Sequence, residues 1–221
     1  MTENAKATQR IRAFFGRLFI VLLIVLAGLE FLYIKQLADT SRRREQLLEQ
    51  QAAEIKKLKD KLRIINAIEE HQKGLTAGEV NQLAEVIYQE SQKYVFDPLL
   101  IMALIITESS FNKNQVSDYG AQGLMQILPS TAGSVARRLG IPRLNEFDLY
   151  NPALNVKLGI AYLFELIFKF KSLKQGVMAY NMGESTIEEY NRYHAEPPAG
   201  FYNKVVSNYR MLKDKYGETA D

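Results

Sequence analysis

An apolar segment close to the N-terminus constrains the fold of this chain more than any other feature. Residues 18–34 are apolar or aromatic except for Gly28 and Glu30. Seventeen residues are near the lower limit for a helix that crosses a bilayer, and Phe14, Phe15 and a snorkelling Arg17 would lengthen it. Cleavage after Ala27 would leave an apolar new terminus, and the chain has no Cys that could carry a lipid there. We therefore expect residues 1–17 to form an N-terminal tail and residues 18–34 an uncleaved transmembrane helix.

The charges around this segment do not give its orientation. Four basic residues precede the span and four follow it: Lys6, Arg10, Arg12 and Arg17, then Lys35, Arg42, Arg43 and Arg44. Because cytoplasmic flanks are normally the more basic ones, the positive-inside count is tied.

Residues 35–73 contain neither Pro nor Gly before the Gly at position 74. The composition predicts one long polar helix, which at 1.5 Å per residue would reach about 58 Å. Apolar residues recur in a short heptad pattern, with Leu48, Ile55 and Leu62 at one position and Gln51, Leu58 and Ile65 at the other. This pattern is compatible with a homodimeric coiled coil and equally with a monomeric stalk.

The remaining residues, 74–221, are expected to form a mainly α domain large enough to bury one core. Thr76-Ala77-Gly78-Glu79 is a capping-box sequence that predicts a helix start, and further helices are expected from about Ser130, Pro152, Lys174, Thr186 and Phe201. No strand pattern stands out. The region carries fourteen Lys/Arg and sixteen Asp/Glu, so the basic excess lies in residues 1–73. Nucleic-acid binding by this domain is therefore not expected.

One carboxylate in this domain has an unusual setting. Asp97-Pro98 predicts the start of an apolar helix that ends near Glu108. Ile101, Leu104 and Ile105 precede Glu108 by seven, four and three residues and so share its face. A poorly solvated acid at a helix C-terminus holds its proton near neutral pH, which a general acid requires. The alternative is a solvated acid at a frayed helix end.

A glycine-punctuated loop follows, Ser117-Asp118-Tyr119-Gly120-Ala121-Gln122-Gly123-Leu124-Met125-Gln126, and leads to Pro129-Ser130-Thr131-Ala132. Together with Glu108-Ser109, Asn151-Pro152, Leu158-Gly159, Tyr162-Leu163 and Ala179-Tyr180-Asn181-Met182-Gly183, these blocks resemble the catalytic domain of the soluble lytic transglycosylase family, in family order from about residue 95 to 183. The resemblance implies a lysozyme-like fold in residues 74–221, here in a membrane-anchored form.

The resemblance also implies a peptidoglycan-cleaving activity without cofactors. Glu108 would protonate the β-1,4 bond between N-acetylmuramic acid and N-acetylglucosamine and would then act as a base, giving a 1,6-anhydro sugar. Ser117 would hydrogen-bond the N-acetyl group, and Met125 and Gln126 would line the glycan groove. Tyr180 would reach the carboxylate or the scissile region, with Asn181 supporting the loop. From the residues alone, a core Met125, a packed Tyr180 and a turn-forming Ser117 stay open as alternatives.

The same resemblance would place the domain on the periplasmic side of a bacterial inner membrane, where the glycan is. Members of the family commonly carry Glu-Thr-Arg before the Tyr that aligns with Tyr202, whereas this chain has Pro198-Ala199-Gly200, with Glu196 as a loose substitute. Two rival functions remain at this point. One is a hydrolytic muramidase similar to goose-type lysozyme, with Asp118 or another carboxylate activating water, and the other is a non-catalytic glycan-binding scaffold. His71 and His194 stand far apart without Cys, so no metal site is expected.

Overall fold

The computed structural model describes residues 2–145 and 147–217. The chain divides into two compact units, Met1–Lys57 and Leu58–Asp221. The described residues contain helices and isolated bridges but no strand, in agreement with the expected mainly α class.

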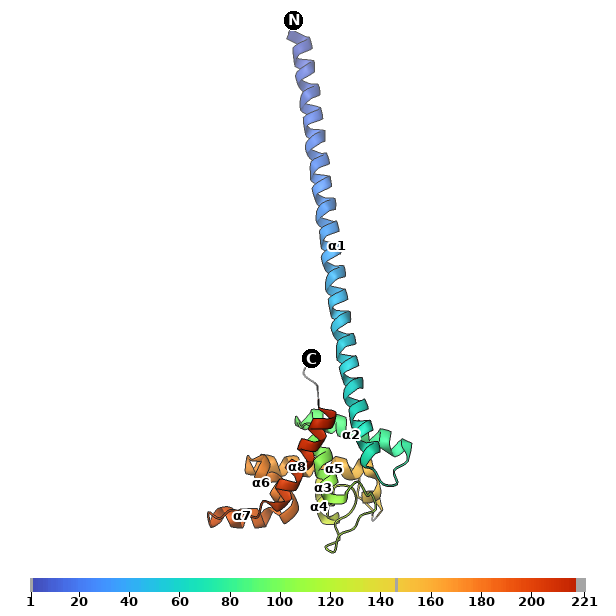
Figure 1. Ribbon diagram of the computed structural model, residues 1–221. Helices are drawn as coiled ribbons and strands as arrows, with labels where there is room; N and C mark the ends of the chain where they lie inside the picture. The colour runs from blue at the N-terminus through green and yellow to red at the C-terminus, as the bar shows by residue number, and fades with distance from the viewer. Residues whose placement is uncertain (1, 146, 218–221) are drawn as a thin grey trace. The chain divides into compact units, whose positions relative to one another are not determined.

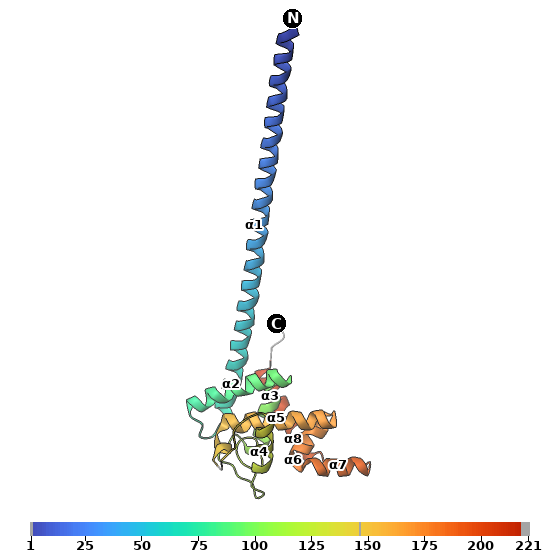
Figure 2. The same cartoon turned by 180° about the vertical axis from the view of Figure 1, so that it is seen from behind.

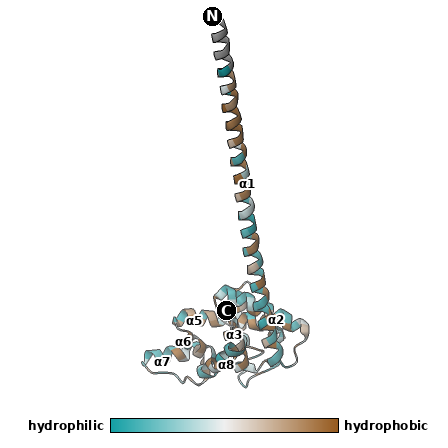
Figure 3. Ribbon diagram, turned by 45° about the horizontal axis from the view of Figure 1, so that its top comes forward, coloured by the Kyte–Doolittle hydropathy of each residue, from teal (hydrophilic) through white to brown (hydrophobic). Residues whose placement is uncertain are grey.

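Helix α1 (Thr2–His71) contains the N-terminal apolar segment. In the described part of the chain, one helical stretch, Phe14–His71, is long and apolar enough to cross a membrane. The large apolar side chains between Leu18 and Ile34 are all exposed, and they colour this part of α1 brown in Figure 3. No described residue of this unit covers these side chains, and a lipid-facing helix requires such exposure.

The last turns of α1 belong to the second unit. Ile64, Ala67 and Ile68 are buried in its core, and Ile65 packs against that core. The second compact unit includes the last turns of α1 from Leu58 onward, whereas the sequence predicts the catalytic domain from residue 74, at the capping box of Thr76. The sequence pattern missed this because the buried positions lie within an otherwise polar helix.

Local sequence explains where the next helices begin. Helix α2 (Ala77–Tyr94) opens with the expected capping box, in which Thr76 accepts from the Glu79 backbone and Glu79 accepts from the Thr76 backbone. Helix α3 (Pro98–Ser109) is capped by Asp97, whose Oδ1 accepts from Leu99 N at 2.9 Å. Helix α4 (Pro129–Arg138) starts on its proline.

The second half of the unit follows the same rules. A short 3-10 turn, η1 (Asp148–Tyr150), precedes α5 (Pro152–Phe170), whose N-cap Asn151 accepts from Leu154 N at 3.0 Å. The remaining helices are α6 (Leu173–Met182), α7 (Glu184–Arg192) and α8 (Gly200–Tyr216). The last five helices begin within two residues of the positions expected from the sequence.

Helix α3 lies inside the unit, packed between α2 and α8, and α5 packs against α2, α4 and α6 (Figures 1 and 2). The α3 side chains Ile101, Met102, Leu104 and Ile105 are fully buried in the main core. The C-terminal end of this buried helix carries Glu108. The packing of α3 in the core therefore fixes the position of the Glu108 carboxylate.

Candidate active site

Glu108 stands at the end of the buried helix in an environment that disfavours its charge. Removal from water raises the pKa of the Glu108 carboxyl from 4.5 to about 8. Among the described residues, none donates a hydrogen bond to this carboxylate or pairs with it. Glu108 is therefore largely protonated at neutral pH and can give its proton to an acceptor.

The carboxyl opens onto a cavity of about 600 Å³, here named the Glu108 cavity. Four other residues expected at the site line it as well: Ser117, Gln126, Tyr180 and Asn181. Because Tyr162 also lines the cavity, every one of the sequence motifs that begin at Glu108, Ser117, Asn151 and Ala179 contributes a side chain to it, although these motifs lie far apart in the chain. Their roles toward a glycan stay predictions.

Met125 does not line this cavity. Its side chain is fully buried, and its sulfur lies so close to Gly159 that a Cβ at that glycine would stand 2.5 Å away. The geometry thus favours the alternative in which Met125 is a core residue. Its backbone still serves the site, because the Met125 carbonyl accepts a hydrogen bond from the Tyr180 hydroxyl at 2.8 Å.

Tyr180 is buried beside Glu108 and contacts the Tyr162 ring, with 5.4 Å between the centroids. Burial, followed by the nearby Glu108 charge, raises the pKa of the Tyr180 phenol well above its usual value. The phenol is therefore neutral. The Tyr180 hydroxyl donates its proton to the Met125 carbonyl oxygen. In this structure the tyrosine therefore holds the wall of the cavity and does not donate to the Glu108 carboxylate.

Hydrogen bonds within the glycine loop shape another part of the cavity wall. Ser117 Oγ accepts from Ala121 N at 3.0 Å, and the Ser117 carbonyl accepts from Gly120 N at 2.9 Å. Ser117 is thus a turn residue that also lines the cavity. The two alternatives left open by the sequence, a turn residue and a site residue, are therefore compatible. Gly120 has a φ of +79°, a conformation that glycine adopts without strain.

Asn155 organises the glycine loop from below and was not singled out by the sequence. Its Oδ1 accepts from Met125 N at 2.8 Å, and its Nδ2 donates to the carbonyls of Gln122 and Leu149 at 2.9 and 3.0 Å. A Cβ at Gly123 would stand 2.3 Å from this Nδ2, so the position must be glycine. A polar residue on the apolar face of α5 was the available signal.

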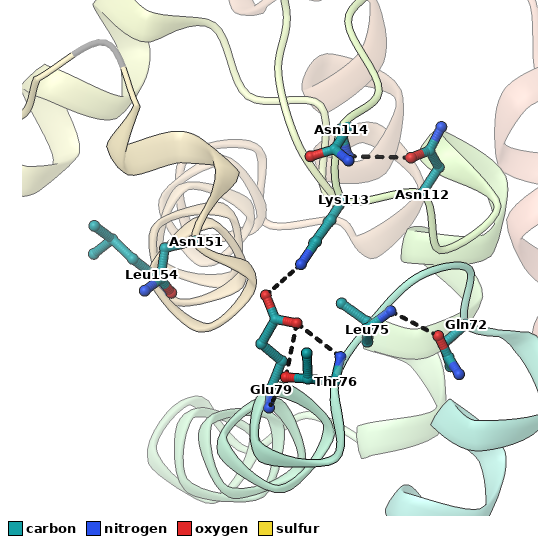
Figure 4. Close-up of polar contacts among 9 residues, drawn as sticks. All are labelled: Gln72, Leu75, Thr76, Glu79, Asn112, Lys113, Asn114, Asn151 and Leu154. Carbon is teal, nitrogen blue, oxygen red and sulfur yellow. Dashed lines mark hydrogen bonds and ion pairs between the residues drawn. The ribbon is translucent and has the colours of Figure 1, made fainter.

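The start of the loop is tied to helix α2. Lys113 Nζ lies 2.5 Å from Glu79 Oε1, while the other oxygen of Glu79 caps α2 through Thr76 (Figure 4). Asn112 Oδ1 accepts from Asn114 N at 3.1 Å in the same turn (Figure 4). These contacts hold the chain immediately after Glu108, where Ser110 and Phe111 have positive φ values.

Two aromatic residues of the cavity were also not predicted as site residues, Tyr119 and Tyr162. Tyr119 is 92% exposed at the tip of the glycine loop. The chain has no Trp, so Tyr119 is the exposed aromatic ring of this wall that a sugar face could stack on.

No second carboxylate joins Glu108 among the described residues that line the cavity. Asp118 is exposed and outside the lining, and Glu196 is an exposed loop residue whose Oε2 lies 3.4 Å from Lys174 Nζ. Within the described residues, no group of three His, Cys, Asp or Glu side chains could hold a metal ion.

The family model described as the transglycosylase SLT domain matches residues 85–200. The chain is 40% identical over 101 residues to membrane-bound lytic murein transglycosylase E of Buchnera aphidicola (Acyrthosiphon pisum), covering 43% of this chain and 45% of that protein. It is 35% identical over 128 residues to a transglycosylase of Enterobacteria phage PRD1, covering 58% and 43% of the two chains. The chain thus spans about half the length of these curated relatives.

Among solved structures, the 70-kDa soluble lytic transglycosylase of Escherichia coli superimposes with a TM-score of 0.55 at 22% identity, covering 61% of this chain and 24% of that one. The lytic transglycosylase Slt of Pseudomonas aeruginosa gives a TM-score of 0.51 at 24% identity, covering 59% and 24%. At these identities the likeness establishes the lysozyme-like fold.

Proposed function

Because the chain belongs to the transglycosylase SLT domain family, whose model matches residues 85–200, we propose that it is a membrane-anchored lytic transglycosylase of murein. The observation that carries the proposal is the position of Glu108, a carboxyl whose pKa is raised by desolvation, at the wall of a cavity in which no described residue supplies a second carboxylate. A typical glycosidase needs two carboxylates, whereas intramolecular ring closure needs only one.

The proposed reaction uses Glu108 twice. The carboxylic acid gives its proton to the bridging oxygen as the bond from that oxygen to the anomeric carbon of N-acetylmuramic acid breaks. The carboxylate then takes the proton of the muramic 6-hydroxyl, and the oxygen of that hydroxyl forms the new bond to the anomeric carbon. The product is a 1,6-anhydro sugar, no water is consumed, and Glu108 returns to its acid form. Ser117, Gln126 and Asn181 line the cavity and would contact the glycan.

We further propose that residues 18–34 anchor the chain in a bacterial inner membrane, with the unit Leu58–Asp221 on the side of the murein. Relatives named membrane-bound lytic murein transglycosylases support the anchoring. The residue pattern of the stalk leaves a homodimer through α1 as a further proposal. Protease treatment of intact and lysed spheroplasts tests the orientation, because only an outward-facing domain is digested before lysis.

Mass spectrometry of the products tests the reaction. Purified sacculi incubated with the protein are expected to release muropeptides ending in 1,6-anhydro-N-acetylmuramic acid. Reducing ends that incorporate oxygen from labelled water would instead establish a hydrolytic muramidase. Absence of turnover by the intact, folded protein would favour a glycan-binding scaffold.

A further inference from the structure

The backbone takes an unusual conformation directly after Glu108-Ser109. Ser110 and Phe111 have φ values of +48° and +59°, so two consecutive residues other than glycine lie in the left-handed region. This conformation is unfavourable for residues that have a Cβ, and it persists only where the surrounding contacts hold it. These two residues are here named the Ser110–Phe111 turn.

The contacts that hold this turn come mainly from Phe111. The Phe111 side chain is fully buried in the main core, and the Phe111 carbonyl accepts a hydrogen bond from Lys73 N at 3.4 Å. Ser110 N donates to the Ile106 carbonyl at 3.0 Å and so ends α3, whereas the Ser110 side chain is exposed. Packing therefore acts on one residue of the turn, and the other supplies its backbone.

The last residue of α1, His71, covers Phe111. The centroids of the two rings are 6.2 Å apart. His71 Nδ1 donates to the Ala67 carbonyl at 2.9 Å, and this bond fixes the orientation of the imidazole ring. Two residues later, Lys73 pairs with Asn112 in an isolated bridge. The end of α1 thus holds Phe111 through a ring contact and through the backbone.

This end of α1 is itself firmly held. Ile64, Ala67 and Ile68 are buried in the core, and Glu70 Oε2 lies 2.6 Å from Lys215 Nζ of α8. Gln72 Oε1 accepts from Leu75 N at 2.8 Å in the turn that follows α1 (Figure 4). The segment that covers Phe111 is therefore a fixed support.

The setting of Glu108 is sensitive to such a support. Burial raises the pKa of the Glu108 carboxyl to about 8, and no described charged group contributes to this change. The other titratable groups that line the Glu108 cavity are the phenols of Tyr119, Tyr162 and Tyr180. Because the raised pKa depends on exclusion of water, a small movement that admits water to the carboxyl would lower it.

We propose that the end of α1 positions the acid, because His71 and the Ser110–Phe111 turn hold Glu108 where water is excluded and where it reaches the glycan. The proposal rests on the proposed function, since it takes Glu108 as the acid. None of these three residues lines the Glu108 cavity. Each acts through Glu108 and is a positioning residue.

Infrared titration of the full-length protein in detergent tests the role of His71 without turnover. The carbonyl absorption of the protonated Glu108 carboxyl is identified by its absence from Glu108→Gln. We expect His71→Ala to lower the pKa of Glu108 by about one unit or more, because the turn loses its cover and water reaches the carboxyl. His71→Phe keeps a ring against Phe111 and should restore the wild-type pKa.

His194→Asn is the matched control, because His194 is exposed and Asn tolerates its positive φ of 51°. It should leave the pKa of Glu108 unchanged. If His71→Ala lowers the melting temperature but leaves the pKa of Glu108 at its wild-type value, His71 serves only packing and the proposal is wrong.

A pair of variants at Ser110 tests the turn separately from the core. Ser110 is exposed, so its replacement changes the backbone preference and not the packing. Glycine adopts a φ of +48° without strain, whereas the β-branched valine strongly disfavours it. We expect the pKa of Glu108 to stay at the wild-type value in Ser110→Gly and to fall by about one unit or more in Ser110→Val. Equal pKa values in the two variants would show that the turn does not position the acid.

Murein cleavage then separates this proposal from the proposed function. In His71→Ala and Ser110→Val, kcat should fall about tenfold or more at unchanged KM, because a displacement of about 1 Å impairs proton transfer. The alkaline limb of the pH profile should move to lower pH. If the wild type does not cleave murein but the pKa of Glu108 responds as expected, the proposed function fails and the positioning stands. If the wild type cleaves murein and both variants keep its kcat and pH profile, the positioning fails alone.

Discussion

Replacement of Glu108 by Gln tests the central carboxyl group through both stability and activity. The change keeps the shape of the side chain and removes its charge and its transferable proton. In the folded protein, desolvation raises the pKa of Glu108 from 4.5 to about 8, whereas the unfolded chain returns it to its ordinary value. The folded state therefore holds the proton more tightly than the unfolded state does.

The sign of the stability effect follows from this difference. Below pH 4.5 the carboxyl is protonated in both states, and the contribution of the buried neutral group is fully present. As the pH rises from 4.5 through 8, the unfolded state loses its proton first, and wild-type stability falls. A pKa change of this size corresponds to up to ~5 kcal/mol. The glutamine variant does not titrate, so its stability relative to wild type should rise by about 2–5 kcal/mol between pH 5 and pH 9.

Urea denaturation followed by circular dichroism at the two pH values measures this difference. Glu165→Gln is the matched control, because that carboxylate is paired with Arg138 near the surface and does not face the cavity. A stability difference between wild type and Glu108→Gln that is the same at pH 5 and pH 9 would refute the desolvated carboxyl. Loss of a general acid typically lowers the rate by about 10²–10⁴-fold. Because Glu108 would act as both acid and base, Glu108→Gln should lower the rate of murein cleavage by about 10⁴-fold or more. Retention of more than about a tenth of wild-type activity would contradict the single-carboxylate mechanism.

Three further outcomes follow from the structure. A truncation to residues 58–221 should fold and stay soluble, whereas 74–221 loses three core side chains of α1 and should be several kcal/mol less stable in urea; equal stability of the two would place the boundary at 74. Gly159→Ala puts a Cβ 2.5 Å from the Met125 sulfur and should lower the melting temperature by the equivalent of about 1–3 kcal/mol, while Gly78→Ala, with its nearest atom at 3.9 Å, should not lower it. Glu196→Ala should reduce murein cleavage less than about threefold, because its charge is exposed; a tenfold loss at unchanged stability would bring a second carboxylate back into the mechanism.

Helix starts and the position of the acid could be predicted from the sequence, because both depend on local signals. Thr76, Asp97 and Asn151 cap the helices that their neighbours predict. The apolar residues at helical spacing before Glu108 predict its buried setting. These features need no knowledge of how distant segments pack.

The burial of the C-terminal end of α1 and of the Met125 side chain depends on how distant segments pack. Local sequence signals therefore could not predict either of them. Ile64, Ala67 and Ile68 look like the apolar residues of a stalk until α1 is placed against the core. Met125 lies among apolar neighbours in a loop, and only its approach to Gly159 shows that its side chain is internal.

The glycine loop separates two kinds of requirement that the sequence presents together. Gly123 is needed for packing, because a Cβ there would collide with Asn155, which in turn fixes Met125 N and the Gln122 carbonyl. Tyr119, in the same loop, makes no such contact and is almost fully exposed beside the cavity. A ring exposed to this degree buries little apolar surface and so adds little to the stability of the fold. The loop therefore combines a rigid backbone, held from α5, with an exposed ring, and the rigidity is what keeps that ring at the rim of the Glu108 cavity.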